Sequence, residues 1–321
     1  MTSISNVDSY KLCHYLVYPP KTEYVSSYIE ARGVSSDFPE TNEIVSLGVQ
    51  GFVRTNMYTP ITCNDIRMAK DFARQHGLPF NEAGWKIILD EYSGYLPLKI
   101  EAIPDGTVVP VGTCQVQVVN TDKRLPWLTS YVETALLRAI WYPSTVAALS
   151  REVKKVCKQF LEETADTLDA LDYMLHDFGA RGASSQETAA IGAHAHLVSF
   201  MGSDTYDAIE YIRNLYYPGS MKGRIVPTKS IPAAEHSTIT SWVANGGEKA
   251  AFKAMIDNFA GPGKIYAVVS DSYDIYHAVD KLWGEELKEE VLNKGGTVVI
   301  RPDSGDPGFV VPRILGILET K

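Results

Sequence analysis

The sequence has few cysteines, and none of them lie close together. The four, Cys13, Cys63, Cys114 and Cys157, are widely separated and form no CxxC pair. This spacing favours neither a zinc site nor a dense disulfide framework. Reduced thiols in a cytoplasm fit the pattern best.

Long apolar runs are also missing. No stretch approaches the length of apolar chain that spans a bilayer. The first residues, MTSISNVDSYK, lack the basic and apolar regions of a signal peptide. We therefore expect a cytoplasmic protein that has no membrane partner.

The chain has no excess of basic residues. Lys and Arg number 30 against 39 Asp and Glu, which gives a formal net charge of −9. This balance argues against nucleic acid as a partner, although a local basic pocket for a small phosphorylated ligand remains open. With 321 residues, of which 45% are hydrophobic and 21% charged, the composition is that of a globular protein.

Common catalytic motifs are absent as well. The sequence contains no P-loop, GxGxxG, GxSxG or HExxH. A DFG triplet occurs at 177–179, but the HRD loop and Gly-rich loop of a kinase do not accompany it. The site must therefore be sought from the order of helices and strands.

Residues 1–171 predict an α+β region. TEYVSSYIEA reads as a strand, and 43–58, 62–76 and 81–92 have helical spacing, the last two opened by Thr62 or Asn64 and by Asn81. LPLKIEAI and CQVQVV read as strands around a turn at 104–106. Two helices, over 125–142 and 144–171, complete the region.

Residues 172–321 predict βα repetition, which is typical of a parallel sheet or barrel. The apolar runs YMLHDFG, LVSFMGSD, IVPTKSIPA, IYAVVSD and TVVIRPDSG each precede a helical pattern, with helices expected from Ser185 and Asp204. A closed barrel needs about 200–250 residues. We therefore expect an incomplete barrel whose C-terminal remainder is missing.

Ligands of such folds meet residues at the carboxyl ends of strands. The polar residues predicted at those ends are Asp177, Arg181, Asp204, Ser230, Glu235, His236, Ser270, Asp271, Arg301, Asp303 and Ser304.

The segment DFGARGASSQE (177–187) places Phe178 and Arg181 between a strand and a helix. An aromatic ring beside a guanidinium suits a flat heteroaromatic ligand that carries a polar group, because stacking and directed hydrogen bonds act together. The alternative is a glycine-shaped turn followed by a helix cap.

His236 lies at a predicted strand-to-helix junction, next to Glu235. It could be a nucleophile toward phosphorus if Asp271 or Asp303 fixes the tautomer of its other ring nitrogen. The alternative is a histidine that caps or packs the helix. His194 and His196 are two apart in a helix, so metal ligation by that pair is not expected.

RPDSGDP (301–307) ends an apolar strand. Arg301 could neutralise phosphate oxygens, and Asp303 could engage ribose hydroxyls or a Mg²⁺ ion carried by a polyphosphate. A solvated turn is the alternative.

Taken together, these segments resemble nicotinamide phosphoribosyltransferases in order and spacing. The matching segments are DSYK (8–11), YPP (18–20), DFGARGASSQET (177–188), GSDT (202–205), SIPAAEHSTITSW (230–242), VSDSYDIYHAVDKLWGEEL (269–287) and IRPDSGDP (300–307). The resemblance implies an irregular α/β barrel of type II phosphoribosyltransferases with a smaller α+β domain, assembled as a homodimer with active sites at the interface.

The same resemblance implies a role for each matching residue. Phe178 and Tyr10 of the partner subunit would sandwich nicotinamide, while Arg181 and Asp204 would bind its carboxamide, with Asp204 repelling nicotinate. Asp8 and Ser230 would belong to the same substrate-binding set.

The remaining implied roles concern phosphate. ATP would phosphorylate His236, with Asp271 orienting it. Arg301 and, from the partner, Arg32 would bind the diphosphate of 5-phosphoribosyl 1-diphosphate, and Asp303 would bind ribose. Mg²⁺ would arrive with the diphosphate or ATP, without a metal site built from protein ligands alone.

Family members continue beyond IRPDSG with further phosphate-binding segments that this sequence lacks. We therefore expect a fragment, a split enzyme or a non-catalytic binding subunit, and no activity of the chain alone. A nicotinate phosphoribosyltransferase is the enzymatic alternative; Asp204 and the YPP and AAEHSTIT segments favour the amide-using branch.

Overall fold

The computed structural model describes residues 3–217 and 226–321. The chain divides into two compact units, Met1–Lys229 and Ser230–Lys321. The boundary predicted at 171–172 falls within the first unit and stays a prediction. No helix in the described ranges is long and apolar enough to cross a membrane.

The first unit begins with an antiparallel region. Strand β1 (Ser26–Ile29) pairs with β5 (Val116–Asn120), which pairs in turn with β3 (Leu98–Ala102). A separate antiparallel pair joins β2 (Glu43–Ser46) to β4 (Thr107–Pro110). The strands predicted in TEYVSSYIEA, LPLKIEAI and CQVQVV are confirmed.

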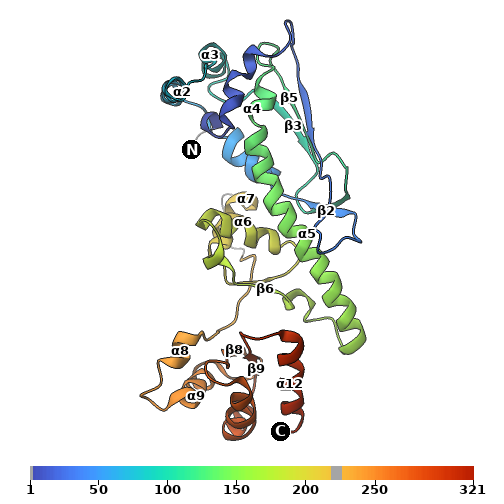
Figure 1. Ribbon diagram of the computed structural model, residues 1–321, viewed down its shortest axis with the longest axis vertical. Coiled ribbons are helices and arrows are strands. Elements are labelled where there is room, and N and C mark those ends of the chain that lie inside the picture. The colour runs from blue at the N-terminus through green and yellow to red at the C-terminus, as the bar shows by residue number, and fades with distance from the viewer. Residues whose placement is uncertain (1–2, 218–225) are drawn as a thin grey trace. The chain divides into compact units, whose positions relative to one another are not determined.

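Figure 1 shows the helices of this part of the chain mainly on one side of these strands. They are η1 (Ser3–Ser5), η2 (Ser9–Leu16), α1 (Val49–Phe52), the π-helical η3 (Val53–Met57), α2 (Cys63–Gln75), α3 (Glu82–Glu91), α4 (Leu128–Tyr131) and α5 (Glu133–Thr164). The predicted helix starts are confirmed at Thr62, which forms a capping box with Asp65, and at Asn81, which accepts the Gly84 N–H.

The core of this unit is aromatic. Trp85 of α3, Tyr131 of α4 and Trp127, the residue directly before α4, are all buried, and their rings meet edge to face with centroids 5.0 to 5.5 Å apart. Edge-to-face packing brings the positive ring edge onto a negative ring face, which favours this geometry. The cluster therefore fixes α3 and α4 against the inner face of β5, where Val116 and Val118 are buried.

Two predicted elements in this unit were wrong. The pattern over 43–58 is not one helix, because its first four residues form β2. The break predicted between 142 and 144 does not occur, because α5 continues through Pro143. The strand β4 was not predicted.

The segment before α1 packs closely on α5 at Pro143. Proline has no N–H, so the carbonyl of Ala139, four residues earlier, loses its helical partner. Gly48 approaches this carbonyl so closely that a Cβ on Gly48 would lie 2.0 Å from the oxygen. Beside it, the Ser144 hydroxyl bonds the backbone of Leu47, with Oγ at 3.1 Å from both the N and the O. The turn before α1 therefore packs against the part of α5 that contains Pro143.

The remainder of the first unit consists of short elements. They are η4 (Leu171–Tyr173), β6 (His176–Asp177), η5 (Ala180–Gly182), α6 (Gln186–His196), β7 (Gly202–Ser203) and α7 (Asp207–Tyr216). Strands β6 and β7 pair in parallel, and Gly202 also bridges Lys229. Ser185 caps α6 as predicted, whereas α7 begins three residues after the predicted Asp204.

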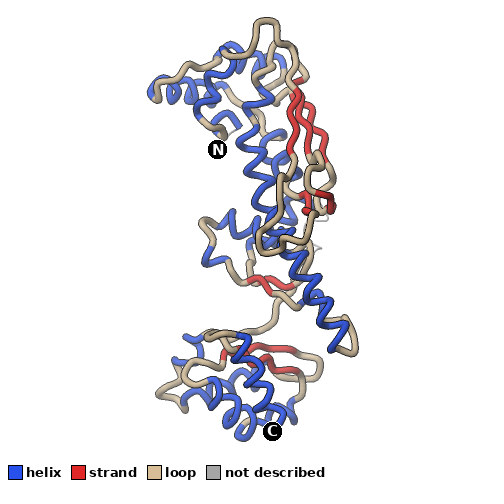
Figure 2. Tube along the Cα trace, turned by 45° about the vertical axis from the view of Figure 1, so that its right-hand side comes forward, coloured by secondary structure: helices blue, strands red, loops and turns tan. Residues whose placement is uncertain are grey.

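The second unit is built on one parallel pair, β8 (Ile265–Val269) and β9 (Thr297–Arg301). Figure 2 shows these strands side by side with helices around them. The helices are α8 (His236–Thr240), α9 (Gly247–Phe259), α10 (Ile275–His277), the π-helical η7 (Ala278–Glu286), α11 (Lys288–Lys294) and α12 (Pro307–Glu319). Helices α9 and α11 were not predicted.

Buried side chains of β8, α9 and η7 form the core of this unit. Tyr266 and Val268 of β8 face inward, and Phe252 of α9 stacks on Trp283 of η7 with centroids 4.6 Å apart. The strand expected in IVPTKSIPA is reduced to isolated bridges at Lys229 and Ala233, and its first residue lies outside the described ranges. Parallel pairing confirms the βα character of this part of the chain, but the described sheets are not closed.

Candidate functional site

Strand β6 and Thr205, two residues after β7, line a cavity of about 600 Å³ in the first unit. Phe178 follows β6, is 58% exposed and lies at the cavity, which places an aromatic face where a ligand can reach it. His176 stacks on Phe178 with ring centroids 6.4 Å apart. The inner wall is supplied by Tyr142 and Ser150 of α5 and by His196 of α6.

Asp204 stands directly after β7. Its Oδ1 lies 3.1 Å from Nε2 of His176, and its backbone N–H donates to the carbonyl of Asp177 at 2.7 Å. The structure therefore brings together Phe178 and Asp204, both predicted from sequence, and adds His176, which was not predicted. Arg181 lies in η5, in the turn that follows Phe178.

Asp177 is the most heavily bonded carboxylate here. Its Oδ2 accepts hydrogen bonds from Ser203 Oγ and Thr205 Oγ1, each at 2.7 Å, and its Oδ1 accepts from the Gly179 N–H at 3.3 Å. Burial alone would raise the pKa of Asp177, but these donors outweigh it and hold the pKa below its ordinary value. The carboxylate is therefore charged at neutral pH.

The two helical histidines behind this region are buried. Burial lowers the pKa of His194 to about 4, and it packs against the rings of Tyr211 and Tyr216. His196 lies within 3.2 Å of both Ser150 Oγ and the Gly202 carbonyl. They contact different neighbours, and no group of three or more His, Cys, Asp or Glu within 3–217 and 226–321 is placed to hold a metal ion.

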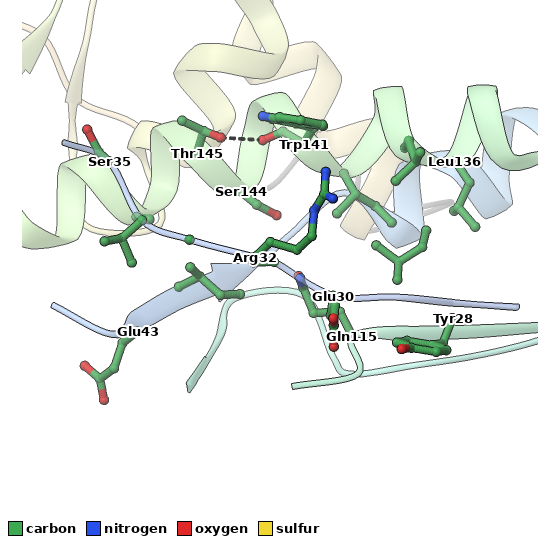
Figure 3. A pocket seen from close by; sticks show the side chains of 18 of the residues that line it. Tyr28, Glu30, Arg32, Ser35, Glu43, Gln115, Leu136, Trp141, Ser144 and Thr145 are labelled. Atoms are coloured by element: carbon green, nitrogen blue, oxygen red, sulfur yellow. Dashed lines mark hydrogen bonds between the residues drawn. The ribbon is translucent and has the colours of Figure 1, made fainter. Parts of the chain in front are cut away.

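Three further predicted residues lie elsewhere in the first unit. Asp8 accepts a 2.5 Å hydrogen bond from Thr134 at the start of α5, and Tyr10 is 58% exposed. Arg32 lines a cavity of about 920 Å³ between the β1–β2 connection and α5. Figure 3 shows its side chain extending toward α5 near Trp141.

The second unit holds a histidine between two carboxylates. Nε2 of His236 lies 3.0 Å from Oδ1 of Asp271, and Nδ1 lies 3.8 Å from Oδ2 of Asp303. His236 is the first residue of α8, after Glu235, which caps the helix through a capping box with Thr238. Of the two partners considered from sequence, Asp271 is therefore the one in hydrogen-bond contact.

Asp271 is itself fixed from the β9 side. Its Oδ2 accepts from the Asp303 N–H at 2.8 Å and from Ser304 Oγ at 2.5 Å, and its side chain is only 5% exposed. Burial would raise the pKa of Asp271, but bonds from Ser304, Asp303 and His236 lower it. A charged Asp271 accepts the Nε2–H of His236 and leaves the lone pair on Nδ1.

Arg301 and Ser230 complete the predicted set. Nη2 of Arg301 is 4.0 Å from Oδ1 of Asp303, and its Nε is buried without a hydrogen-bond partner in the described part of the chain. An unpaired buried guanidinium N–H favours an anionic ligand. Ser230 is exposed at the start of the unit.

A buried indole lies behind Asp271. Trp283 of η7 donates its Nε1–H to Ser270 Oγ at 3.0 Å, and Ser270 is fully buried directly before Asp271. The Ser270 hydroxyl donates in turn to the Val268 carbonyl at 3.0 Å. This chain of bonds anchors the end of β8.

Glu248, in the first turn of α9, provides a test of this unit that needs no ligand. Burial raises the pKa of its carboxyl to about 7; His277 opposes the shift, and Asp271 and Asp274 add to it. The folded pKa exceeds the ordinary value of 4.5, so folding binds an extra proton between pH 4.5 and 7. The free energy of unfolding should therefore fall as pH rises through this window, by on the order of 1–2 kcal/mol after allowance for solvent screening.

Glu248→Gln should remove that part of the pH dependence and be the more stable form at pH 8. Urea unfolding at pH 5 and pH 8 measures it, with the exposed Glu319→Gln as the matched control. Equal pH dependence of the wild type and Glu248→Gln would contradict the assignment.

Comparison with known proteins places the chain in a family. A model of the nicotinate phosphoribosyltransferase family matches residues 173–317, and a model of the nicotinamide phosphoribosyltransferase N-terminal domain matches residues 3–100. The crystal structure of nicotinate-nucleotide pyrophosphorylase from Pyrococcus furiosus has a TM-score of 0.58 at 14% identity, covering 99% of this chain and 62% of that one. At this identity the likeness shows the fold.

Two curated relatives are similar over almost the whole chain. The nicotinamide phosphoribosyltransferase of Xanthomonas campestris pv. campestris is 47% identical over 315 residues, 98% of this chain and 64% of the relative. That of Acinetobacter baylyi is 31% identical over 329 residues, 96% of this chain and 63% of the relative. The chain thus spans less than two thirds of the length of these relatives.

The family models and the shared fold define the class as phosphoribosyltransferases. Within that class, the chain belongs to the nicotinamide phosphoribosyltransferase family.

Proposed function

We propose that the protein transfers a phosphoribosyl group from 5-phosphoribosyl 1-diphosphate to nicotinamide, as an enzyme of NAD salvage. The observation that carries the proposal is the cavity at the end of β6, which Phe178 and His176 line, together with the carboxylate of Asp204, whose Oδ1 lies 3.1 Å from Nε2 of His176. A flat amide-bearing heterocycle matches Phe178 and Asp204, because its amide N–H groups can donate to Asp204 while its ring stacks.

In the transfer, the pyridine nitrogen attacks C1 of the sugar. A C–N bond forms, the bond from C1 to the diphosphate oxygen breaks, and diphosphate leaves with Mg²⁺. Positive charge develops on the ribose ring, so positioning and electrostatics are the main tasks of the protein. Arg301 and, from a second copy, Arg32 would bind diphosphate, while Asp303 would bind ribose.

The histidine of the second unit would couple the reaction to ATP. Nδ1 of His236 attacks the γ-phosphorus, a P–N bond forms and ADP leaves. The contact between Nε2 and Asp271 supports this choice of nitrogen, since it commits the proton to Nε2. Hydrolysis of the phosphohistidine then returns the free imidazole and phosphate.

The proposal includes a homodimer and an irregular barrel. The exposure of Tyr10 supports a second copy that receives its ring. The parallel pairs β6–β7 and β8–β9 support a parallel barrel. Asp8 and Ser230 would contribute to substrate binding.

The test of the proposed function compares the binding and the turnover of nicotinamide with those of nicotinate. The protein should bind nicotinamide more tightly than nicotinate in calorimetry. Chromatography should detect nicotinamide mononucleotide from nicotinamide, 5-phosphoribosyl 1-diphosphate, Mg²⁺ and ATP once a polypeptide that carries the family's further phosphate-binding segments is added to the chain. Tighter binding and faster turnover of nicotinate would assign the protein to the acid-using reaction instead.

Asp204→Asn should reduce the preference for nicotinamide over nicotinate by about 10-fold, because the carboxylate that repels nicotinate is removed. The effect is moderate because Asp204 is 45% exposed. The ratio of the two dissociation constants measures it. Asp207→Asn, with the same change in charge, is the matched control and should leave the ratio unchanged. An unchanged ratio in Asp204→Asn would refute its role.

A further inference from the structure

Asp177 connects the two loops that carry the ring site. Its carboxylate accepts from Ser203 and Thr205, the residues on either side of Asp204, and from the N–H of Gly179, the residue after Phe178. Its own carbonyl accepts the N–H of Asp204 at 2.7 Å. One residue thus bonds the neighbours of Phe178 and of Asp204, the two side chains that the proposed function assigns to the ligand.

The backbone alone gives these loops little support. β6 and β7 are two residues each, so their parallel ladder joins only His176 to Gly202 and Asp177 to Ser203. Ser203 also takes part in a second bond, because its Oγ accepts the Thr205 N–H at 3.0 Å. Hydrogen bonds to a charged acceptor are stronger than neutral ones, so the side-chain network can hold what the short ladder cannot.

Burial makes the hydroxyl donors of this network dependent on the Asp177 carboxylate. Ser203 and Thr205 are 4% and 2% exposed, so their hydroxyls have little access to water as a substitute acceptor. A buried donor that loses its acceptor costs more than the bond contributed. The loops should therefore rearrange when the carboxylate is lost.

We propose that Asp177 is a positioning residue, which sets the spacing of Phe178 and Asp204 for an amide-bearing ring. The identity of the ligand rests on the proposed function. The hydrogen bonds by which Asp177 holds the two loops, here called the Asp177 clamp, do not depend on it. Asp177 acts through its neighbours: it holds Asp204 where a carboxamide can donate to it and Phe178 where the ring can stack.

Asp177→Asn preserves the size of the side chain but leaves one acceptor oxygen for donors that now use two. The nicotinamide dissociation constant should rise about 10-fold or more, and the preference for nicotinamide over nicotinate should fall with it, because loop displacement of about 1 Å is enough to cause such losses. Hydrogen exchange at the Asp204 and Gly179 amides should accelerate about 10-fold.

Two variants of Thr205 keep the test decisive if Asp177→Asn folds poorly. Thr205→Val removes the hydroxyl at nearly constant volume and should show the same changes in smaller degree, while Thr205→Ser should restore wild-type binding. In the double variant with Asp177→Asn, the Thr205→Val effect should largely vanish, because the two residues share one bond.

The outcomes separate the clamp from the function. Unchanged exchange at both amides in Asp177→Asn, or a uniform loss of binding for both ligands with no change in their ratio, would overturn the proposal. If the wild type fails to bind nicotinamide, the proposed function fails, and the amide exchange rates alone decide the clamp.

Discussion

His236→Ala is expected to lose phosphate transfer from ATP while retaining, in the enzyme completed by the family's further phosphate-binding segments, a slower, ATP-independent transfer to nicotinamide. The reason is that the alanine side chain has no nucleophile to attack the γ-phosphorus, whereas the ring site in the other unit is unchanged. Labelling of the protein by ATP that carries a labelled γ-phosphate measures the first step. His277→Ala, the matched histidine of the same unit, should be labelled like the wild type.

Asp271→Asn should reduce labelling by roughly 10²–10⁴-fold, the range seen when a positioned proton-transfer partner is lost. An amide placed 3.0 Å from Nε2 can donate its N–H to that nitrogen and so drive the ring proton to Nδ1, where it blocks attack. Labelling that persists in His236→Ala, or that is lost equally in His277→Ala, would place the phosphoryl acceptor elsewhere.

Gly48→Ala is expected to destabilise the first unit by about 4 kcal/mol or more. Gly48 has φ +110°, and a Cβ there would lie 2.0 Å from the Ala139 oxygen, so the methyl group adds a backbone clash to an unfavourable conformation. The clash cannot be relieved by a side-chain rotation, because the opposing atom is a backbone carbonyl oxygen of α5.

The control separates these two costs. Gly106 also has a positive φ, +87°, but nothing lies within 4 Å of a Cβ built there. Gly106→Ala should therefore cost only about 1–2 kcal/mol, the conformational part. Chemical unfolding followed by circular dichroism compares the two, and equal losses would show that the approach to Ala139 carries no energetic weight.

The packing of Gly48 on α5 also marks a place where prediction from the sequence failed. Helix starts at Thr62, Asn81 and Ser185 were predictable because a capping side chain acts on the backbone three residues away. Pro143 predicted a break, but α5 continues through it, and the residue packed against this step of the helix, Gly48, is far away in the sequence. A local pattern carries no information about such a partner.

In the candidate site, too, some residues could be predicted from local sequence and others required the coordinates. Strand ends were visible as apolar runs followed by polar residues, which located Asp177, Asp204 and Asp271. The choice between Asp271 and Asp303 as the contact of Nε2 required coordinates, since both follow adjacent strands. His176 precedes its strand end by one residue, so the rule passed over it, and only pairing of β6 with β7 brings it to Asp204.

The indole behind Asp271 gives the second unit an optical reporter. The Nε1–H of Trp283 bonds to the hydroxyl of the residue directly before Asp271, and its ring is 4% exposed, so solvent quenchers reach it poorly. Indole emission responds to charge and hydrogen bonding at the nitrogen. A change of charge at His236 passes to Asp271 and from there across one peptide link to the residue that holds the indole, so the Trp283 component of the emission, one of five tryptophans in the chain, should respond to the state of the histidine.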